Sequence, residues 1–316
     1  MQIIITGGGG FLGQRLAKTL LKSTLAFDTL VLVDIVMPSN PGDDSRVQCK
    51  QLDLTMEGAM RDLVTPQTKI IFHLAAIVSS HAERDFDIGW KVNLDITRSL
   101  LEAVRHTNPT IRFVFSSSLA VYGGDLPPVV NETTTVTPRS SYGAQKAMGE
   151  LLVNDYSRKG FVDGVVLRLP TICVRPGRPN LAASSFVSSI IREPLRGEEA
   201  VCPVSRDLAI LVSSPDTAIR NLIHAATLKT DLLGWRTINL PGITVTVEHM
   251  LDALKRITNE ATVDRVQFKP DESINRIVTS WPGALDNTKA LQLGFLADNS
   301  FDNFIRQHID DNKQTA

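Results

Sequence analysis

The start of the chain sets a glycine-rich loop directly between a strand pattern and a helix pattern. The β-branched residues Ile3–Ile5 are followed by the run Thr6-Gly-Gly-Gly-Gly-Phe-Leu-Gly13, and a helical pattern then covers residues 14–22. Glycines permit a tight turn and a close approach of backbone N–H groups to a ligand, while a helix N-terminus favours negative charge. This order is typical of a pyrophosphate-binding loop that opens a parallel α/β sheet.

The glycine run can be read in two ways. The pattern TGxxGxxG starts its glycines at Gly7 and the pattern GxGxxG starts them at Gly8, while Gly10 and Gly13 serve in both. An ordinary tight turn without a ligand is the alternative to either reading. The candidate cofactor contacts in this loop are Gly7, Gly10, Phe11, Leu12 and Gly13.

Acidic residues follow the next two strand patterns. Asp34 ends the run LVLVD, 21 positions after the last loop glycine. A carboxylate there can accept hydrogen bonds from both hydroxyls of an adenosine ribose and repels a 2′-phosphate, which predicts NAD rather than NADP. Arg46 and Lys50 are cations further on that could weaken this preference, and Asp34 could instead be a capping residue. Asp53 and Leu54 could lie near the adenine, or Asp53 could cap the segment that follows.

Short strand patterns alternate with longer helix patterns through the first half of the chain. The strand patterns are IIIT, LVLVD, RVQCKQLDL, KIIFHLA, RFVFSSS and GVVLRLP. Such alternation predicts an α/β fold with a Rossmann-type, doubly wound parallel sheet. After Pro170 the pattern changes to a proline-rich loop, VRPGRPNLAASS, then a helix and a hairpin-like stretch. We expect a smaller, interleaved C-terminal substrate lobe to begin there.

The domain boundaries follow from these patterns. We expect residues 1–170 to form an NAD-binding Rossmann domain and residues 171–206 and 243–316 to form the substrate-binding lobe. Residues 207–242 contain the strand pattern LAILVS, a Ser-Pro-Asp helix start with an amphipathic helix, and the strand pattern RTINLP. Both strand patterns are expected to return to the Rossmann sheet.

The composition excludes several classes of function. The chain has 33 basic and 34 acidic residues and a net charge of −1, so no broad field attracts nucleic acid or an anionic membrane. Its 3 cysteines are an odd number without a CxxC pair, which argues against a disulfide framework and against a zinc site. We therefore expect no bound metal, no nucleic-acid or membrane partner, and a cytoplasmic enzyme without a secretory leader.

A tyrosine and a lysine lie in a spacing suited to acid–base chemistry. Tyr142 and Lys146 are four positions apart in a helix pattern, so their side chains share one face. A free tyrosine has a pKa of about 10, and a neighbouring cation favours the phenolate, so the pair could act as a general base near neutral pH. The pair follows a strand pattern that ends in three hydroxyl groups. A solvated helix face is the alternative.

In their order along the chain, these motifs resemble the extended short-chain dehydrogenase/reductase family, which includes nucleotide-sugar epimerases and sugar dehydrogenases. The resemblance is close over the first 170 residues and looser over the rest. It implies NAD as cofactor and a homodimer formed through the fourth and fifth helices. The motifs that carry it are TGGGGFLG, Asp34, HLAA at 73–76, FSSSLAVYG at 115–123, YGAQK at 142–146 and RLP at 168–170.

The resemblance also implies roles for single residues. Ser118 would orient the substrate, with Ser116 and Ser117 as alternatives. Tyr142 would be the acid/base, and Lys146 would hold the nicotinamide ribose and lower the pKa of the tyrosine. Further cofactor contacts would come from Ala75, Ala76, Asn93, Tyr142, Pro170 and Ile172.

Departures from the family pattern narrow the chemistry. Leu119-Ala120 stand where sugar dehydratases carry an acidic pair, and Pro170-Thr171 stand where nucleotide-sugar epimerases typically carry an asparagine. Residues 73–95 and 168–186 resemble a branch of the family that uses NAD to oxidise the C2 hydroxyl of a four-carbon sugar acid to a 2-oxo acid. By this resemblance the substrate contacts are Ser79, Ser118, Tyr142, Thr171, Arg178 and Asn180.

Some alternatives stay open from the sequence. An arginine can bind a substrate carboxylate through two hydrogen bonds, but either Arg175 or Arg178 could do so, and either could lie on the surface. His81 could face the pocket or be a structural side chain. A nucleotide-sugar epimerase that keeps its NAD is the alternative enzyme. A non-catalytic NAD-sensing protein is a third hypothesis, which the presence of Ser118, Tyr142 and Lys146 disfavours.

Overall fold

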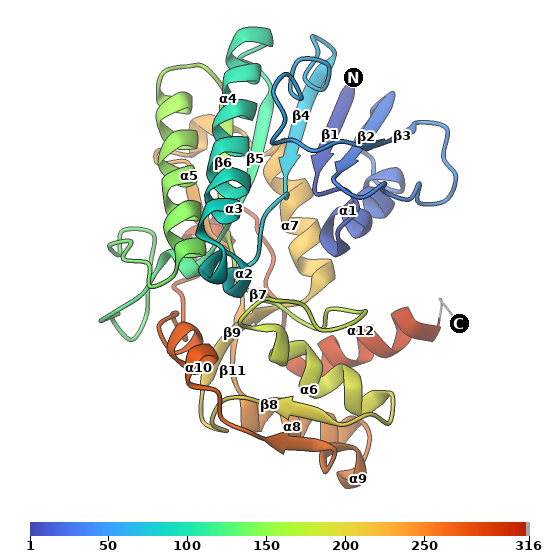
Figure 1. Ribbon diagram of the computed structural model, residues 1–316, viewed down its shortest axis with the longest axis vertical. Helices are drawn as coiled ribbons and strands as arrows, with labels where there is room; N and C mark the ends of the chain where they lie inside the picture. The colour runs from blue at the N-terminus through green and yellow to red at the C-terminus, as the bar shows by residue number, and fades with distance from the viewer. Residues whose placement is uncertain (314–316) are drawn as a thin grey trace.

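The centre of the fold is a seven-stranded parallel sheet, as the alternating pattern predicts (Figure 1). The computed structural model describes residues 1–313. The chain runs from β1 outward to β3 and then returns to place β4 on the other side of β1, which leaves a crevice at the carboxyl ends of the strands. The strands lie in the order β10 (Thr237–Asn239), β6 (Asp163–Leu169), β5 (Arg112–Ser118), β4 (Thr68–His73), β1 (Gln2–Thr6), β2 (Thr29–Asp34) and β3 (Val47–Gln51).

Helices cover both faces of this sheet, so the fold is doubly wound. On one face, α1 (Phe11–Leu21) and α7 (Pro215–Thr227) pack over the buried side chains of Ile3 and Ile5. On the other, α4 (Ile96–Thr107) and α5 (Ser141–Arg158) pack over Ile4, because successive side chains of a strand point to opposite faces. Apart from the edge strand β3, the strand patterns read from the sequence are strands that are largely buried on both sides.

A smaller lobe with its own apolar core lies below the sheet in Figure 1. It contains a three-stranded sheet of β11 (Ile243–Thr246), β9 (Ala209–Ser213) and β7 (Thr171–Ile172), and a two-stranded sheet of β12 (Val266–Phe268) and β8 (Ala200–Cys202). Its helices are α6 (Ser185–Leu195), α8 (Val247–Ile257), α9 (Glu260–Val263), α10 (Glu272–Val278) and α12 (Phe301–Lys313).

Two expectations about this region were wrong. The strand β9 does not return to the main sheet: it pairs antiparallel with β11 and parallel with β7, whereas α7 and β10 do return to the Rossmann part. The hairpin-like stretch after α6 is also not a hairpin, because β8 pairs in parallel with β12, which lies more than sixty positions later in the chain. Both pairings join distant segments that no local pattern identifies. The division of the chain into two domains at the boundaries given above stays a prediction.

An ion cluster ties the two parts together. The Arg15 guanidinium of α1 donates to Asp216 of α7, with 2.9 Å between Nε and Oδ1, and to Asp311 of α12, with 2.8 Å between Nη1 and Oδ2. It therefore bridges the Rossmann part and the last helix of the smaller lobe. The remaining short elements are α2 (Ser79–Arg84), α3 (Phe86–Trp90), η1 (Lys91–Asp95), η2 (Leu119–Val121), η3 (Thr230–Leu232) and α11 (Thr288–Gln292).

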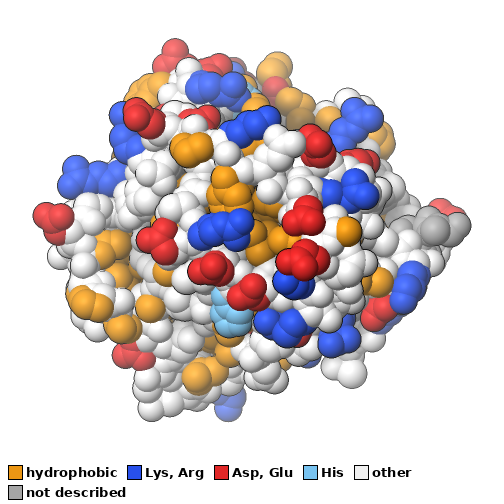
Figure 2. Space-filling model, turned by 90° about the horizontal axis from the view of Figure 1, so that it is seen from below, with side chains coloured by type: hydrophobic (Ala, Val, Ile, Leu, Met, Phe, Trp, Pro, Cys, Tyr) orange, Lys and Arg blue, Asp and Glu red, His pale blue; other side chains and the backbone are white. Residues whose placement is uncertain are grey.

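The surface carries no extended region of one charge on the face seen from below. Figure 2 shows acidic and basic side chains interspersed there, in keeping with the nearly balanced composition. None of the helices within residues 1–313 is long and apolar enough to span a bilayer.

Candidate active site

A cleft of about 340 Å³ lies at the carboxyl ends of the central strands and is lined by both lobes. Most of the residues predicted to bind cofactor or substrate line it: Gly7, Gly10, Phe11, Leu12, Gly13, Ala76, Ser79, Ser118, Tyr142, Lys146, Pro170, Thr171, Ile172 and Asn180. Six predicted residues do not: Asp34, Asp53, Leu54, Ala75, Asn93 and Arg178. The cleft is thus built from segments that lie far apart in the sequence.

The glycine loop turns tightly at the end of β1. Gly7 has a φ of +72°, a conformation that L side chains rarely adopt, and a Cβ at Gly13 would lie 2.2 Å from the Gly7 carbonyl oxygen. Gly10 is the N-cap of α1, and no side chain caps the helix or places an acid in its first turn. The first N–H groups of α1 therefore face the cleft as a site for an anion. Gly7 lines the cleft and Gly8 does not, which favours the TGxxGxxG reading.

Asp34 lies beside the same loop, at the end of β2. Its Oδ2 accepts a hydrogen bond from the N–H of Gly9 at 3.0 Å. Arg46, which could have favoured a 2′-phosphate, is occupied elsewhere: it pairs with Asp44 at 2.8 Å and stacks over Phe27. The residues present therefore fit a dinucleotide with free ribose hydroxyls, the form found in NAD.

The other predicted cofactor residues outside the cleft include Leu54, which is buried and lines a different hollow. Asp53 accepts hydrogen bonds from the backbone and hydroxyl of Thr55, the local capping role that the sequence left open. The buried amide of Asn93 exchanges hydrogen bonds with the backbone of Ile77, at 2.8 and 3.1 Å. It thereby fixes the segment that follows β4. Ala75 lies against Gly7, where an added Cβ would come within 2.8 Å of the Ala75 nitrogen.

The three serines at the end of β5 differ in their hydrogen bonds. The Ser116 hydroxyl donates to the carbonyl of His73, and the Ser117 hydroxyl donates to the Glu150 carboxylate. The Ser118 hydroxyl accepts from the backbone of Ala120 and is hydrogen-bonded to Tyr142. Ser118 is therefore the hydroxyl of the three that lies beside the tyrosine.

Tyr142 and Lys146 lie near the start of α5 and share one face, as predicted. The helix is capped by Ser140, which accepts from the N–H of Gly143. Burial raises the pKa of Tyr142 to about 12, and the hydrogen bond with Ser118 opposes that shift. Burial lowers the pKa of Lys146 to about 7, while the charge of Glu150 opposes it. The phenol and the ammonium therefore titrate in an environment that disfavours charge on both.

A buried polar network surrounds Lys146. Lys146 is 1 % exposed, and its Nζ donates to the carbonyl of Ser116 at 2.8 Å. One turn further along α5, Glu150 forms a buried ion pair with Arg168 of β6 at 2.6 Å. Arg168 also donates to the hydroxyl of Tyr122 at 2.5 Å. Because each buried charge has partners, this network fixes the floor of the cleft rigidly.

The loop between β7 and α6 covers the cleft from the side of the smaller lobe. The Ser79 hydroxyl accepts from the N–H of Ala183 at 2.9 Å and so ties the loop to α2. Arg175 lines the cleft, is partly buried and pairs with no carboxylate within residues 1–313, whereas Arg178 is exposed. Burial and the positive charge of Arg192 both lower the pKa of Arg175. The Nη1 of Arg175 donates to the carbonyl of Arg178 at 3.4 Å, and a guanidinium without a carboxylate partner in such a place is suited to binding an anion.

Several cleft residues were not singled out from the sequence. Ala182 and Ser184 belong to the predicted substrate loop, so the loop itself was the available signal. Trp281 comes from the segment after α10, nearly a hundred positions after the end of the loop, and no motif surrounds it. His81, an open candidate, does not line the cleft.

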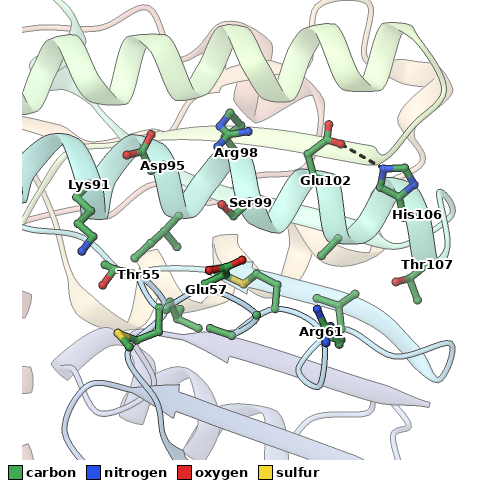
Figure 3. A pocket seen from close by; sticks show the side chains of 18 residues that line it. Thr55, Glu57, Arg61, Lys91, Asp95, Arg98, Ser99, Glu102, His106 and Thr107 are labelled. Atoms are coloured by element: carbon green, nitrogen blue, oxygen red, sulfur yellow. Dashed lines mark ion pairs between the residues drawn. The ribbon is translucent and has the colours of Figure 1, made fainter.

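A larger hollow of about 660 Å³ lies apart from these residues, between α4 and the segment 54–64 (Figure 3). Its charged side chains alternate in sign along the helix, with Lys91, Asp95 and Arg98 followed by an ion pair of Glu102 and His106. It contains neither the serine, the tyrosine nor the lysine described above. The candidate active site is therefore the smaller cleft.

Comparison with known proteins identifies the family of this fold. The family model described as the NAD dependent epimerase/dehydratase family matches residues 3–228. A solved structure named as a nucleoside-diphosphate-sugar epimerase from Agrobacterium tumefaciens is 41% identical, with a TM-score of 0.94 over 100% of this chain and 95% of that chain. The doubly wound fold and the extended short-chain dehydrogenase resemblance are both confirmed.

Two curated relatives are similar over nearly their whole length. A D-erythronate dehydrogenase from Haemophilus influenzae is 56% identical over 312 residues, which cover 98% of this chain and 99% of the relative. A D-erythronate dehydrogenase from Cupriavidus necator is 49% identical over 320 residues, which cover 98% of each. Both relatives are named as dehydrogenases, the class of enzyme that the sequence predicts.

Proposed function

This chain belongs to the NAD dependent epimerase/dehydratase family and is an NAD-dependent oxidoreductase, and we propose that it oxidises the C2 hydroxyl of a short sugar acid. The specific reaction is D-erythronate to 2-oxo-D-erythronate. The observation that carries the proposal is the guanidinium of Arg175, which has no carboxylate partner among residues 1–313 and lines the same cleft as Ser118, Tyr142 and Lys146.

The cleft residues divide the chemistry between them. Tyr142 takes the proton of the C2 hydroxyl, and Ser118, which is hydrogen-bonded to the phenol, holds the same substrate oxygen as it becomes a carbonyl. The ammonium of Lys146 lies 5.8 Å from the centre of the Tyr142 ring, so its positive charge would oppose the rise that burial gives to the pKa of the phenol. NAD, when bound, supplies the hydride acceptor.

One feature of the cleft supports an acid as the substrate. The glycine loop, Ser118, Tyr142 and Arg175 all line the same cleft, so a carboxylate bound to Arg175 belongs to a molecule that also reaches the reacting centre. Arg175 would bind the carboxylate through two hydrogen bonds, in place of the exposed Arg178 favoured from the sequence.

The names of the relatives support the same choice. Both curated relatives above are named for D-erythronate, whereas the structural neighbour at 41% identity is named as an epimerase. The epimerase name keeps nucleotide-sugar epimerisation as the second candidate function. An epimerase returns the hydride to its substrate and forms no net NADH, which separates the two by measurement.

The test is to mix the purified protein with excess NAD and one candidate substrate at a time. D-Erythronate, L-threonate, other short aldonic acids, uronic acids and UDP-glucose form the series. NADH formation with D-erythronate in proportion to substrate added is the expected result. If no acid gives NADH and UDP-glucose is converted without net NADH formation, the proposal is wrong and the protein is a nucleotide-sugar epimerase.

The homodimer implied by the family stays part of this proposal. Leu151 of α5 is 60% exposed, which leaves an apolar side chain on one of the two helices through which the family commonly pairs. Sedimentation at increasing protein concentration would measure the mass of the assembly directly.

A further inference from the structure

Two cavities meet at the side chain of Trp281. The first is the active-site cleft, and the second is a small cavity of about 10 Å³ that shares part of its lining. Both are lined by Trp281, Leu119, Thr171 and Ser184. A space of that size holds about one water molecule at most, so the second cavity admits no part of a substrate as it stands.

The shared wall lies next to the reacting centre. Leu119 directly follows Ser118 in the chain, and Thr171 directly follows Pro170 at the end of β6. Arg175 lines the cleft and not the second cavity. A substrate whose carboxylate binds Arg175 can therefore direct its other end towards Trp281.

The second cavity is apolar apart from the shared wall. Its remaining lining includes Phe186 and Val187 of α6, Ile210 and Leu211 of β9, and Val278 of α10. These side chains belong to or adjoin the core of the smaller lobe and are buried. A hydroxyl group placed among them would lose its hydrogen bonds to water without replacement.

Trp281 is held firmly in this wall. Its segment is fixed by hydrogen bonds from the Thr244 hydroxyl to the Gly283 carbonyl at 2.7 Å, and from the Val130 N–H to the Ala284 carbonyl at 3.1 Å. Its ring packs against the apolar cores on both sides. The indole donates no hydrogen bond in the described part of the chain, so its role there is to fill space.

We propose that Trp281 sets the upper limit on the length of the substrate by closing the cleft off from the adjoining apolar cavity. This inference rests on the proposed function. A four-carbon acid ends against the indole, and a longer acid meets it before its carboxylate reaches Arg175. Removing the indole joins the two cavities and extends the substrate site into apolar surroundings.

The apolar lining determines which longer acids a Trp281 variant should oxidise more efficiently. In Trp281→Ala, a 2,3-dihydroxyhexanoate with the configuration of D-erythronate at C2 and C3 places an alkyl tail in the new space. Gluconate has the same number of carbons but would bury hydroxyls there without partners. We expect the ratio of kcat/KM for the dihydroxyhexanoate to that for D-erythronate to rise on the order of 10- to 100-fold, because each added methylene in an apolar pocket is worth a factor of that size. The same ratio for gluconate should rise far less.

The experiment measures these ratios by NADH formation in the native chain and in four variants. Trp281→Ala and Trp281→Leu should both raise the ratio, with the leucine variant giving the smaller gain and retaining more of the packing. Trp281→Phe keeps a ring in the wall and should leave the ratio nearly unchanged. Trp235→Ala is the matched control, since Trp235 is exposed and lines neither cavity.

The outcomes separate the inference from the proposed function. If the native chain oxidises D-erythronate but neither Trp281→Ala nor Trp281→Leu raises the ratio, the inference is overturned and the function stands. An equal rise in the kcat/KM ratio for gluconate would also overturn the inference, because the new space would then accept hydroxyl groups as readily as an alkyl tail. If the native chain oxidises no acid, the proposed function fails and the inference fails with it. NAD binding by each variant checks that the Rossmann part is folded.

Discussion

At the scale of single residues, the proposed chemistry depends first on one phenolic oxygen. Tyr142→Phe keeps the ring and removes only the group that takes the substrate proton, so kcat should fall by about 10²- to 10⁴-fold. NAD affinity, measured by titration, should stay close to that of the native chain, because the glycine loop and Asp34 are untouched. Turnover within a factor of a few of the native value would show that another group is the base.

The charge of Arg175 is expected to act on the substrate alone. Arg175→Gln removes a charge-assisted pair worth about 1.5–3 kcal/mol, so KM for D-erythronate should rise roughly 10- to 100-fold. Arg178→Gln, in the same loop but exposed and outside the cleft, is the matched control and should change little. Steady-state kinetics at saturating NAD measure both, and the reverse ranking of the two variants would place the carboxylate at Arg178.

The catalytic candidates could be predicted from the sequence because they lie in short, ordered motifs. Ser118, Tyr142 and Lys146 each follow a strand end or a helix start that local patterns identify, and the cleft brings them together. Choosing between Arg175 and Arg178 needed burial, which the loop sequence does not reveal. Trp281 could not be found at all, because its place in the cleft depends on how the smaller lobe folds back.

At the scale of elements, the entry from β1 into α1 is the most constrained part of the fold. Gly13→Ala would force a Cβ to within 2.2 Å of the Gly7 carbonyl oxygen, where backbone cannot move away cheaply. We expect a lower melting temperature and weaker NAD binding, since the loop must open to accept the methyl group. Gly234→Ala is the control: nothing lies within 4 Å of its added Cβ, so its melting temperature should match or slightly exceed that of the native chain.

Thermal melting with and without NAD measures the effect of each glycine variant. If Gly13→Ala melts at the native temperature and binds NAD normally, the close contact between loop and helix does not constrain the turn. That outcome would contradict the assignment of the loop as the pyrophosphate site.

The strands of the main sheet were predicted well, and the pairings in the smaller lobe were not. Most strands of the main sheet are apolar runs in the sequence, and β1 to β6 all lie where the strand patterns occur. The strand β9 has a similar run, LAILVS, but its partners β7 and β11 are short and lie on either side of it in the sequence. Composition alone cannot assign such a strand to one sheet or the other.

At the scale of the whole molecule, two buried imidazoles connect stability to pH. Burial lowers the pKa of His73 to about 3, with the Lys146 charge adding to the shift, and burial followed by the charges of Arg196 and Arg192 lowers that of His308 to about 4. The unfolded chain binds these protons near pH 6.5, and the folded chain does not until the pH is much lower. Stability should therefore fall as the pH drops from 6.5 towards 4, with a slope of about 1.4 kcal/mol per pH unit for each proton.

His308 allows this dependence to be tested away from the active site. It lies 3% exposed on α12, so His308→Gln should flatten the decline of the unfolding free energy between pH 6.5 and 4. His249→Gln, at an exposed position on α8, should leave the slope unchanged. Denaturant unfolding at several pH values measures the slopes, and equal slopes in all three proteins would contradict the account of His308.

The overall architecture could be predicted, while the way in which the lobes meet could not. A doubly wound sheet follows from alternating patterns, and a second lobe follows from the change after Pro170. The bridge from Arg15 to Asp216 and Asp311 joins residues at opposite ends of the chain, and only the folded structure reveals it. The cleft is lined by both lobes, so its shape depends on that meeting of the lobes.

The central claim is that hydride leaves C2 of a short sugar acid for NAD, and isotopic labelling tests it most directly. D-Erythronate carrying deuterium at C2 should transfer that deuterium to the cofactor, giving deuterated NADH detectable by mass spectrometry, and substrate labelled at C3 should transfer none. Label arriving from C3, or none from C2 while NADH forms, would contradict the proposed reaction.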